Sequence, residues 1–213
     1  MRRSLRERAT TWQIASLLLD YPDAAWWARL PLLRGEAETL PADLSRPLLA
    51  FLECVAGANR TALAEDYVAT FDSKRRCCLY LTYYAYGDTR KRGVALLAFK
   101  RAYRAAGVVL SDDELPDHLA VVLEFGATAD PEAGHRLLVD HRAGLELLRL
   151  ALGDAGSPWR AVLDAVSATL PPLQGDERDA VERLAAVGPP AEEVGLEPFA
   201  PPEYMPTTMG ARR

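Results

Sequence analysis

The chain has 213 residues, 49% of them hydrophobic, a formal net charge of −5 and an isoelectric point of about 5.3. This size and composition fit one or two domains with a normal buried core. The acidic balance argues against nucleic acid as a partner, because such binding depends on neutralising phosphates with cationic side chains. The three cysteines, Cys54, Cys77 and Cys78, suggest no disulfide framework, so a reducing compartment is the simpler interpretation.

The first 23 residues combine a basic start with an apolar run, as a signal peptide does. Glu7 interrupts the basic part, Asp20 ends the apolar part, and no small-x-small cleavage site follows. Ile14, Leu17 and Leu18 instead have the spacing of a core-facing helix. No segment approaches the roughly 18 apolar residues of a membrane span, so we expect a cytoplasmic protein that does not insert into a membrane.

Helical periodicity recurs along the rest of the chain, and strand-like alternation is rare. The expected helices cover residues 4–20, 23–38, 43–58, 60–72 and 77–86, a helix capped by Gly107, a helix from Pro116 to about Ala127, one over 131–152, one that begins at Ser157-Pro158 and stops before Pro171, and a weaker one over 176–187. We therefore predict an all-α fold, with a single helical domain of about nine or ten helices over residues 1–187.

The sequence changes character from Gly188 onward, with six prolines in 26 residues and no period. This composition is typical of a disordered tail, and we expect one over residues 188–213. The alternative is a segment that docks back on the protein through apolar anchors. These anchors are Val194, Leu196, Phe199, Tyr204 and Met205.

The sequence offers little support for a metal site. Cys77-Cys78 is not a CxxC pair, and His135 and His141 are six residues apart. His141 also lies on the apolar stripe of the 131–152 helix, so we interpret it as a hydrogen-bonded core histidine. The cysteines are expected to be inert core residues.

Signals of nucleophilic catalysis or phosphate binding are also missing. There is no GxSxG elbow, no papain-like cysteine context and no P-loop spacing. Asp117 and His118 are adjacent, and neighbouring side chains on a helix diverge, so they are badly placed as a base and its orienting partner. Two basic clusters, Lys74–Arg76 and Arg90–Arg92, are either solvated faces or a docking surface for an anionic partner.

The stretch "SDDELPDHL", residues 111–119, interrupts the helical pattern with a proline, an acid and a histidine. Ser111 and Glu114 have capping-box spacing, and Pro116 favours the end of one helical turn and the start of a new helix. Asp117 would then stabilise the first turn through the helix dipole. His118 could pair with a carboxylate or carbonyl of another segment. We expect a hinge near residues 111–118, where a peptide groove could lie.

Three segments in the same order resemble the redox enzyme maturation chaperones, the TorD/DmsD/NarJ family. "ELPDHLAVVLEF" (114–125) is similar to their E-x-P-D-H signature, and "DYVATFD" (66–72) to their tyrosine-x-x-x-phenylalanine segment. "LYLTYYAYGDTRKRG" (79–93) resembles the nitrate reductase branch of that family, although Tyr84 and Tyr86 stand where histidines are expected.

The resemblance implies a TorD-like, cofactor-free chaperone and not an enzyme. Its expected partner is the N-terminal segment of the apo catalytic (alpha) subunit of nitrate reductase, which it would hold competent for molybdenum cofactor insertion and subunit assembly. Molybdenum cofactor delivery proteins are further expected partners. Two alternatives are a chaperone that reads the twin-arginine signal of a dimethyl sulfoxide or trimethylamine N-oxide reductase, and a small helical enzyme that uses Asp117 and His118.

The residues expected to bind the peptide come from the two segments around residues 80–92 and 114–118. Aromatic side chains would line an apolar groove, an acid and a histidine would meet basic or polar groups at its rim, and arginines would meet acidic ones. They are Tyr80, Tyr83, Tyr84, Tyr86, Arg90, Arg92, Glu114, Pro116, Asp117 and His118. For each tyrosine, ordinary core packing is the alternative.

Overall fold

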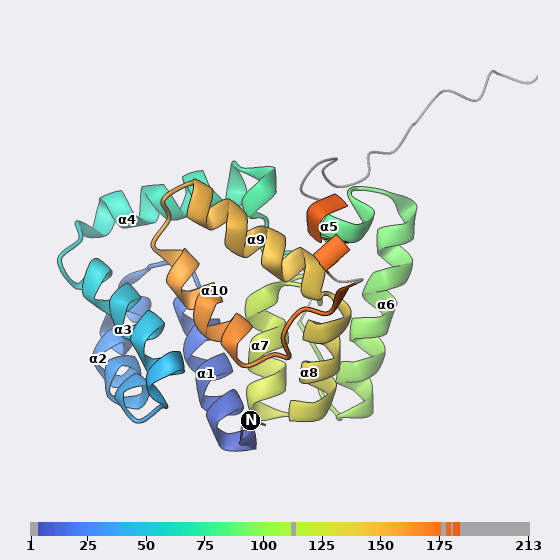
Figure 1. The fold of residues 1–213 in the computed structure, drawn as a ribbon, viewed down its shortest axis with the longest axis horizontal. Helices are drawn as coiled ribbons and strands as arrows, with labels where there is room; N and C mark the ends of the chain where they lie inside the picture. Colours follow the sequence, from blue (N-terminus) through green and yellow to red (C-terminus); the bar gives the residue numbers. More distant parts are fainter. Residues whose placement is uncertain (1–3, 112–113, 176–177, 180, 184–213) are drawn as a thin grey trace, which may run out of the picture.

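The computed structural model describes residues 4–111, 114–175, 178, 179 and 181–183. Within these residues every regular element is a helix, and the one β-bridge joins Tyr80 to His118. The elements are α1 (Leu5–Leu18), α2 (Ala24–Glu38), α3 (Ala42–Ala56), α4 (Arg60–Tyr67), α5 (Leu81–Tyr86), α6 (Arg90–Ala105), α7 (Leu119–Thr128), α8 (Pro131–Asp140), α9 (Arg142–Asp154) and α10 (Trp159–Ala168), with a π-helical turn at Val68–Asp72 and a 3-10 turn at Arg75–Cys77 (Figure 1). The all-α prediction is confirmed.

The core forms where α1 packs against α7 and α10, while α10 also packs against α3 and α9. Trp12, Trp26 and Trp159 are among its largest fully buried side chains. The indole N–H of Trp12 donates to Thr169 Oγ1 at 2.8 Å, and that of Trp159 donates to the Leu18 carbonyl at 3.2 Å. The Trp12 and Trp159 rings therefore combine a large buried apolar area with a satisfied polar atom, whereas Trp26 Nε1 is buried without a hydrogen-bond partner among the described residues.

Most helix boundaries agree with the periodicity, but the predicted helix over 131–152 is wrong in one respect. The backbone of His141 leaves helical geometry, with φ −110° and ψ 23°, and separates α8 from α9. The apolar stripe continues across this break, since Leu138, Leu145 and Leu148 are all fully buried. A hydrophobic pattern that runs on unbroken cannot reveal such a bend. His141 is only partly buried, and its Nδ1 lies 2.9 Å from the Leu137 carbonyl oxygen.

The segment from 60 to 86 is also more divided than the periodicity indicated. The expected helix over 60–72 is α4 continued by the π-helical turn, and only the later part of 77–86 is helical, as α5. Cys78 and Tyr80 have extended backbone geometry. The expected weak helix over 176–187 is helical at its described residues, whereas its other residues and the tail over 188–213 lie outside the described part of the chain.

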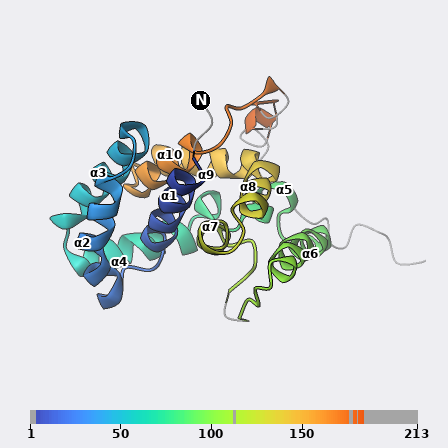
Figure 2. The ribbon, with the colours of Figure 1, turned by 90° about the horizontal axis from the view of Figure 1, so that it is seen from below.

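Helix α6 lies at the edge of the molecule, beside α5 and opposite α2 and α3 (Figures 1 and 2). Its inner side is held by Phe99 and Tyr103, which are 0% and 2% exposed. Phe99 packs on His141 with a ring centroid distance of 4.8 Å, and Tyr103 packs on Phe125 at 4.6 Å. Gly107 ends this part of the chain at φ +74°, which confirms its predicted capping role.

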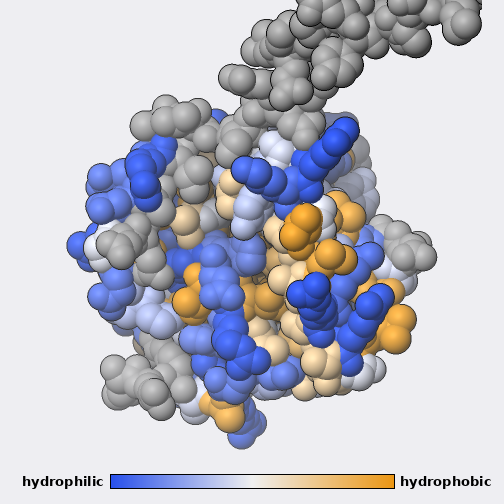
Figure 3. Space-filling view, turned by 90° about the vertical axis from the view of Figure 1, so that its right-hand side faces the viewer, coloured by the Kyte–Doolittle hydropathy of each residue, from blue (hydrophilic) through white to orange (hydrophobic). Residues whose placement is uncertain are grey.

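The outer face of α6 mixes charged and apolar side chains, as the surface view of that side of the molecule shows (Figure 3). Val94 is 70% exposed and Leu97 is 47% exposed. In the described residues, no helix is both long enough and apolar enough to cross a bilayer.

Candidate functional site: a buried aspartate that joins two segments

Two segments almost forty residues apart meet at the isolated antiparallel bridge between Tyr80 and His118. The Leu81 N–H donates to the Asp117 carbonyl at 3.1 Å, and the Leu119 N–H donates to the Leu79 carbonyl at 2.8 Å. This pairing brings the start of α5 against the start of α7. It also corrects the predicted helix start at Pro116, because residues 117–119 take part in the pairing and α7 begins only at Leu119.

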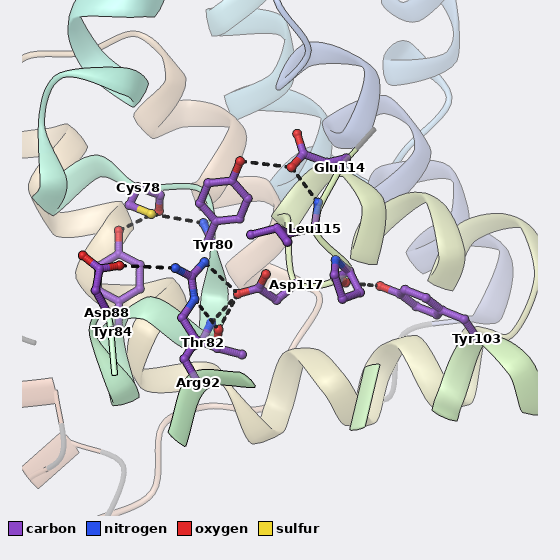
Figure 4. Close-up of polar contacts among 11 residues, drawn as sticks. Cys78, Tyr80, Thr82, Tyr84, Asp88, Arg92, Tyr103, Glu114, Leu115 and Asp117 are labelled. Atoms are coloured by element: carbon purple, nitrogen blue, oxygen red, sulfur yellow. Dashed lines mark hydrogen bonds and ion pairs between the residues drawn. The ribbon is translucent and has the colours of Figure 1, made fainter. Parts of the chain in front are cut away.

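The Asp117 side chain is the centre of the resulting cluster (Figure 4). It is 0% exposed, so its predicted place at the rim of a groove, in the first turn of a helix, is wrong. Its Oδ2 accepts the Thr82 N–H at 3.1 Å and the Thr82 hydroxyl at 2.5 Å. A buried carboxylate is tolerated only when such donors compensate for lost hydration.

Arg92 closes the cluster from α6. Its Nη2 lies 3.8 Å from Asp117 Oδ2, its Nε donates to Thr82 Oγ1 at 3.2 Å, and its Nη1 lies 3.5 Å from Asp88 Oδ1. The guanidinium also lies over the Tyr80 ring, 5.3 Å from its centroid. The side chain is 16% exposed. Arg92 is thus occupied by internal contacts and ties α6 to both paired segments.

Tyr80 and Glu114 form a second link between the segments. The Tyr80 hydroxyl donates to Glu114 Oε1 at 3.0 Å, and the same carboxylate oxygen accepts the Leu115 N–H at 2.8 Å. Burial and this hydrogen bond raise the pKa of Tyr80 to about 12, so the phenol stays a donor. Glu114 therefore fixes Leu115, whereas the expected capping turn from Ser111 is not seen at the described residues: Ser111 is not helical and Glu114 lies in a bend.

His118 faces Tyr80 and not Asp117. Its ring meets the Tyr80 ring edge-on with a centroid distance of 5.3 Å, and its Nδ1 is buried without a hydrogen-bond partner among the described residues. Burial lowers the pKa of His118, against the opposing effect of Glu114 and Asp117. Asp117 and His118 do not form a base held by an orienting carboxylate, because the Asp117 carboxylate contacts Thr82 and Arg92 instead of the His118 ring.

The other expected site residues are distributed unevenly around this cluster. Tyr83 and Tyr84 are 8% and 4% exposed, and the single Tyr84 hydroxyl proton is shared between the Cys78 and Arg76 carbonyls, at 2.9 and 3.1 Å. Tyr84 is therefore a core residue and does not line an open groove. Tyr86 is half-buried, and Arg90 is exposed at the first turn of α6.

A pocket of about 230 Å³ opens next to the cluster, between the C-terminal half of α6 and the chain that leads to α7. Of the ten expected residues, it is lined by Glu114 and Pro116 alone. The Pro116 carbonyl accepts the Tyr103 hydroxyl at 2.5 Å, which joins the pocket wall to α6. The full lining is Lys100, Tyr103, Arg104, Val108, Val109, Leu110, Ser111, Glu114, Leu115 and Pro116. The pocket thus offers apolar walls with two cations at one side.

Sequence reasoning did not single out Thr82, Tyr103, Lys100 or Arg104. Thr82 carries no signal, because its role depends on a partner 35 residues away. The role of Tyr103 depends on its hydroxyl, which bonds to the Pro116 carbonyl of another segment. In the described residues, no three histidine, cysteine, aspartate or glutamate side chains are grouped so that they could hold a metal ion.

The sequence of the chain, including this cluster, matches a known protein family. The sequence profile of the nitrate reductase delta subunit family matches residues 37–164, a range that contains all ten expected site residues. The chain belongs to the nitrate reductase delta subunit family. The resemblance noted from the three segments is therefore confirmed.

Members and relatives of this family align over most of the chain. A nitrate reductase molybdenum cofactor assembly chaperone, NarJ, of Bacillus subtilis is 33% identical over 165 residues, which cover 77% of this chain and 90% of that protein. NarJ of Escherichia coli is 30% identical over 154 residues, covering 71% of this chain and 65% of that protein. The nitrate reductase-like protein NarX of Mycobacterium tuberculosis is 43% identical over 162 residues, but the match spans only 24% of its length.

A solved structure shows the same fold. The crystal structure of a redox enzyme maturation protein from Archaeoglobus fulgidus superposes with a TM-score of 0.57 at 23% identity, covering 79% of this chain and 94% of that protein. The two proteins therefore share the helical fold.

Proposed function

We propose that this protein is a nitrate reductase assembly chaperone. It binds the N-terminal segment of the apo catalytic subunit in the cytoplasm, holds it competent for molybdenum cofactor insertion, and is not an enzyme. The observation that carries this proposal is the alignment with the Bacillus subtilis NarJ chaperone over 90% of that protein's length. Proteins that deliver the cofactor are proposed as further partners.

The pocket beside α6 is the proposed anchor for the client peptide. An amphipathic peptide binds by placing a few apolar side chains into a groove, and Leu115, which is 40% exposed, offers an apolar wall next to Pro116. Lys100 and Arg104 at the same pocket would meet an acidic peptide residue. This arrangement replaces the expected groove of tyrosines with a pocket on the other side of the 111–118 segment.

The buried cluster has a positioning role in this proposal. Asp117 holds the paired segments together, and Glu114 and Pro116 extend these contacts to the pocket wall. Asp117 and His118 would therefore influence peptide affinity through the shape of the wall, without touching the peptide. The enzyme alternative finds no support in this geometry, because the Asp117 carboxylate is fully buried.

Calorimetric titration of the full chain tests the proposal. The titrant is a peptide matching the first ~15–30 residues of the nitrate reductase catalytic subunit, long enough for several helical turns, and a twin-arginine signal peptide of another molybdoenzyme is the control. We expect saturable binding of the first peptide and none of the second. Binding of the twin-arginine peptide alone would assign the protein to an exported reductase, and binding of neither peptide would contradict the chaperone proposal.

A matched pair of leucine substitutions tests the pocket. Leu115→Ser should weaken peptide affinity about fivefold to tenfold, because part of a leucine's apolar burial on binding is lost. Leu150→Ser on α9 is the control, since Leu150 is 41% exposed and does not line the pocket. Equal affinities of the two variants would show that the peptide binds elsewhere.

A further inference from the structure

The outward side of α6 carries a stripe that no described part of the protein covers. Five residues at helical spacing form it, and we call it the outer stripe of α6: Arg90, Val94, Leu97, Arg101 and Arg104. All five are exposed. Val94 at 70% and Leu97 at 47% exposure are apolar, and arginines lie at both ends of the stripe.

The charge of this helix is opposite to that of the whole chain. α6 contains six basic residues and no acidic one, whereas the net charge of the chain is −5. Lys100, Arg101 and Arg104 form no ion pair within the part of the chain that the structure describes. A basic helix with two exposed apolar residues in its middle fits a segment that is both acidic and apolar.

The chain itself contains such a segment beyond the last described residue. Residues 192–205, "EEVGLEPFAPPEYM", hold four glutamates and no basic residue. Apolar side chains lie between the glutamates, at Val194, Leu196 and Phe199. The order of acid, apolar and acid along this segment matches the order of base, apolar and base along the outer stripe.

A short linker tethers this segment to the last described residue. Eight residues, 184–191, separate Arg183 from Glu192, and an extended chain of that length reaches about 26–29 Å. α6 itself, with its 16 residues, is about 24 Å long. A segment tethered at this distance has an effective concentration in the millimolar range, so weak contacts are enough for occupancy.

We propose that residues 192–205 dock on the outer stripe of α6 within the same chain, with apolar side chains over Val94 and Leu97 and glutamates against the flanking cations. The docked segment covers Val94 and Leu97, the exposed apolar pair of α6. Because the contact involves no client, this inference does not depend on the proposed function.

The scarcity of lysine in this protein makes a direct test possible. The chain has only three lysines, and two of them, Lys91 and Lys100, lie on α6, whereas Lys74 precedes the 3-10 turn. All three are exposed. A zero-length carbodiimide coupling joins a carboxylate to an amine that it already touches, so the lysine that each tail glutamate selects reports its position.

The experiment uses the full chain at micromolar concentration, followed by peptide mass spectrometry of the monomer. We expect Glu192, Glu193, Glu197 or Glu203 coupled to Lys91 or Lys100, with little coupling to Lys74, and a yield that falls at high salt. Coupling of the tail glutamates to no lysine, equally to Lys74, or only between two copies of the chain would overturn the proposal.

A charge-reversal pair separates the outer stripe from a general charge effect. Arg101→Glu/Arg104→Glu keeps Lys100 as the reporter and should lower its coupling to the tail about threefold or more. Arg46→Glu/Arg75→Glu changes the net charge equally at exposed sites away from α6, and should leave the coupling unchanged. Equal losses in both variants would show that only net charge matters.

Discussion

At the residue scale, Asp117 is the side chain on which the cluster depends, and Asp117→Asn should destabilise the fold. The substitution keeps the shape but removes the charge that accepts two hydrogen bonds from Thr82 and faces Arg92 at 3.8 Å. Hydrogen bonds to a charged group contribute about 1.5–3 kcal/mol, so we expect a loss of this size in the free energy of unfolding, measured by urea denaturation.

Asp88 provides the matched control for this prediction. It lies 3.5 Å from the same Arg92, but its side chain is 67% exposed. Exposed ion pairs contribute about 0–1 kcal/mol, so Asp88→Asn should leave the free energy of unfolding nearly unchanged. If both variants lose the same free energy of unfolding, burial of Asp117 does not strengthen its contacts. The proposed positioning role of Asp117 would then be contradicted.

The same residues show what the sequence could and could not predict about the site. Tyr80, Glu114 and Asp117 were singled out, and they do meet in one cluster. Asp117 was nevertheless expected in the first turn of a helix that starts at Pro116, and at the rim of a peptide groove. Its burial follows from the backbone pairing of Asp117 with Leu81 and of Leu119 with Leu79. Such pairing between distant segments leaves no periodic signal in either one.

At the scale of elements, the crossing of α7 and α8 depends on two glycines. A Cβ atom on Gly134 would clash with Gly126 Cα, and one on Gly126 would lie 2.8 Å from Trp12 Cε3. Gly134→Ala should therefore push the helices apart and lower the free energy of unfolding by about 1–3 kcal/mol, the usual cost of overpacking a core. Thermal or urea denaturation measures this loss.

Gly93 on α6 is the control with the opposite expected sign. Nothing lies within 4 Å of a Cβ at this position, and alanine is a better helix former than glycine. Gly93→Ala should raise the free energy of unfolding by about 0.5–1 kcal/mol. A stabilising Gly134→Ala would show that α7 and α8 can separate without cost, which would contradict their close packing.

The helices themselves were largely predictable from apolar spacing, because each buries one face in a common core. Apolar spacing did not predict bends or extended residues that leave the spacing of buried residues unchanged. His141 bends the chain between α8 and α9 while the leucines on either side stay buried. Cys78 and Tyr80 are extended inside a segment that is otherwise a good helix former, and Tyr80 pairs with His118 of the 117–119 segment.

At the scale of the whole molecule, the order of three family-like segments was enough to predict the fold and the family, since all three lie inside the matched range 37–164. The position of α6 was not predictable. The sequence predicted a helix there but not that one face of it would lie at the edge of the molecule. Exposure of Val94 and Leu97 is a property of the assembled fold.

Global stability should fall as the pH drops through about 6.5, the pKa of histidine in an unfolded chain. Burial lowers the pKa of both His118 and His135 in the folded protein. Each site then binds a proton more weakly when folded than when unfolded, so acid favours unfolding and the stability is fully present only above the unfolded pKa. Asp20 acts with the opposite sign at lower pH, because burial raises its pKa above 3.8.

Urea denaturation from about pH 7.5 to about pH 5.5 measures this dependence over the window where histidine titrates. His118→Gln/His135→Gln should flatten the curve, since neither replacement binds a proton in that range. His118 should account for the larger part, because its ring is held inside the junction of the 79–81 and 117–119 segments, with Nδ1 unpaired among the described residues. If the double variant keeps the slope of the original protein, the loss at low pH arises from other groups, and burial of these two rings does not control acid stability.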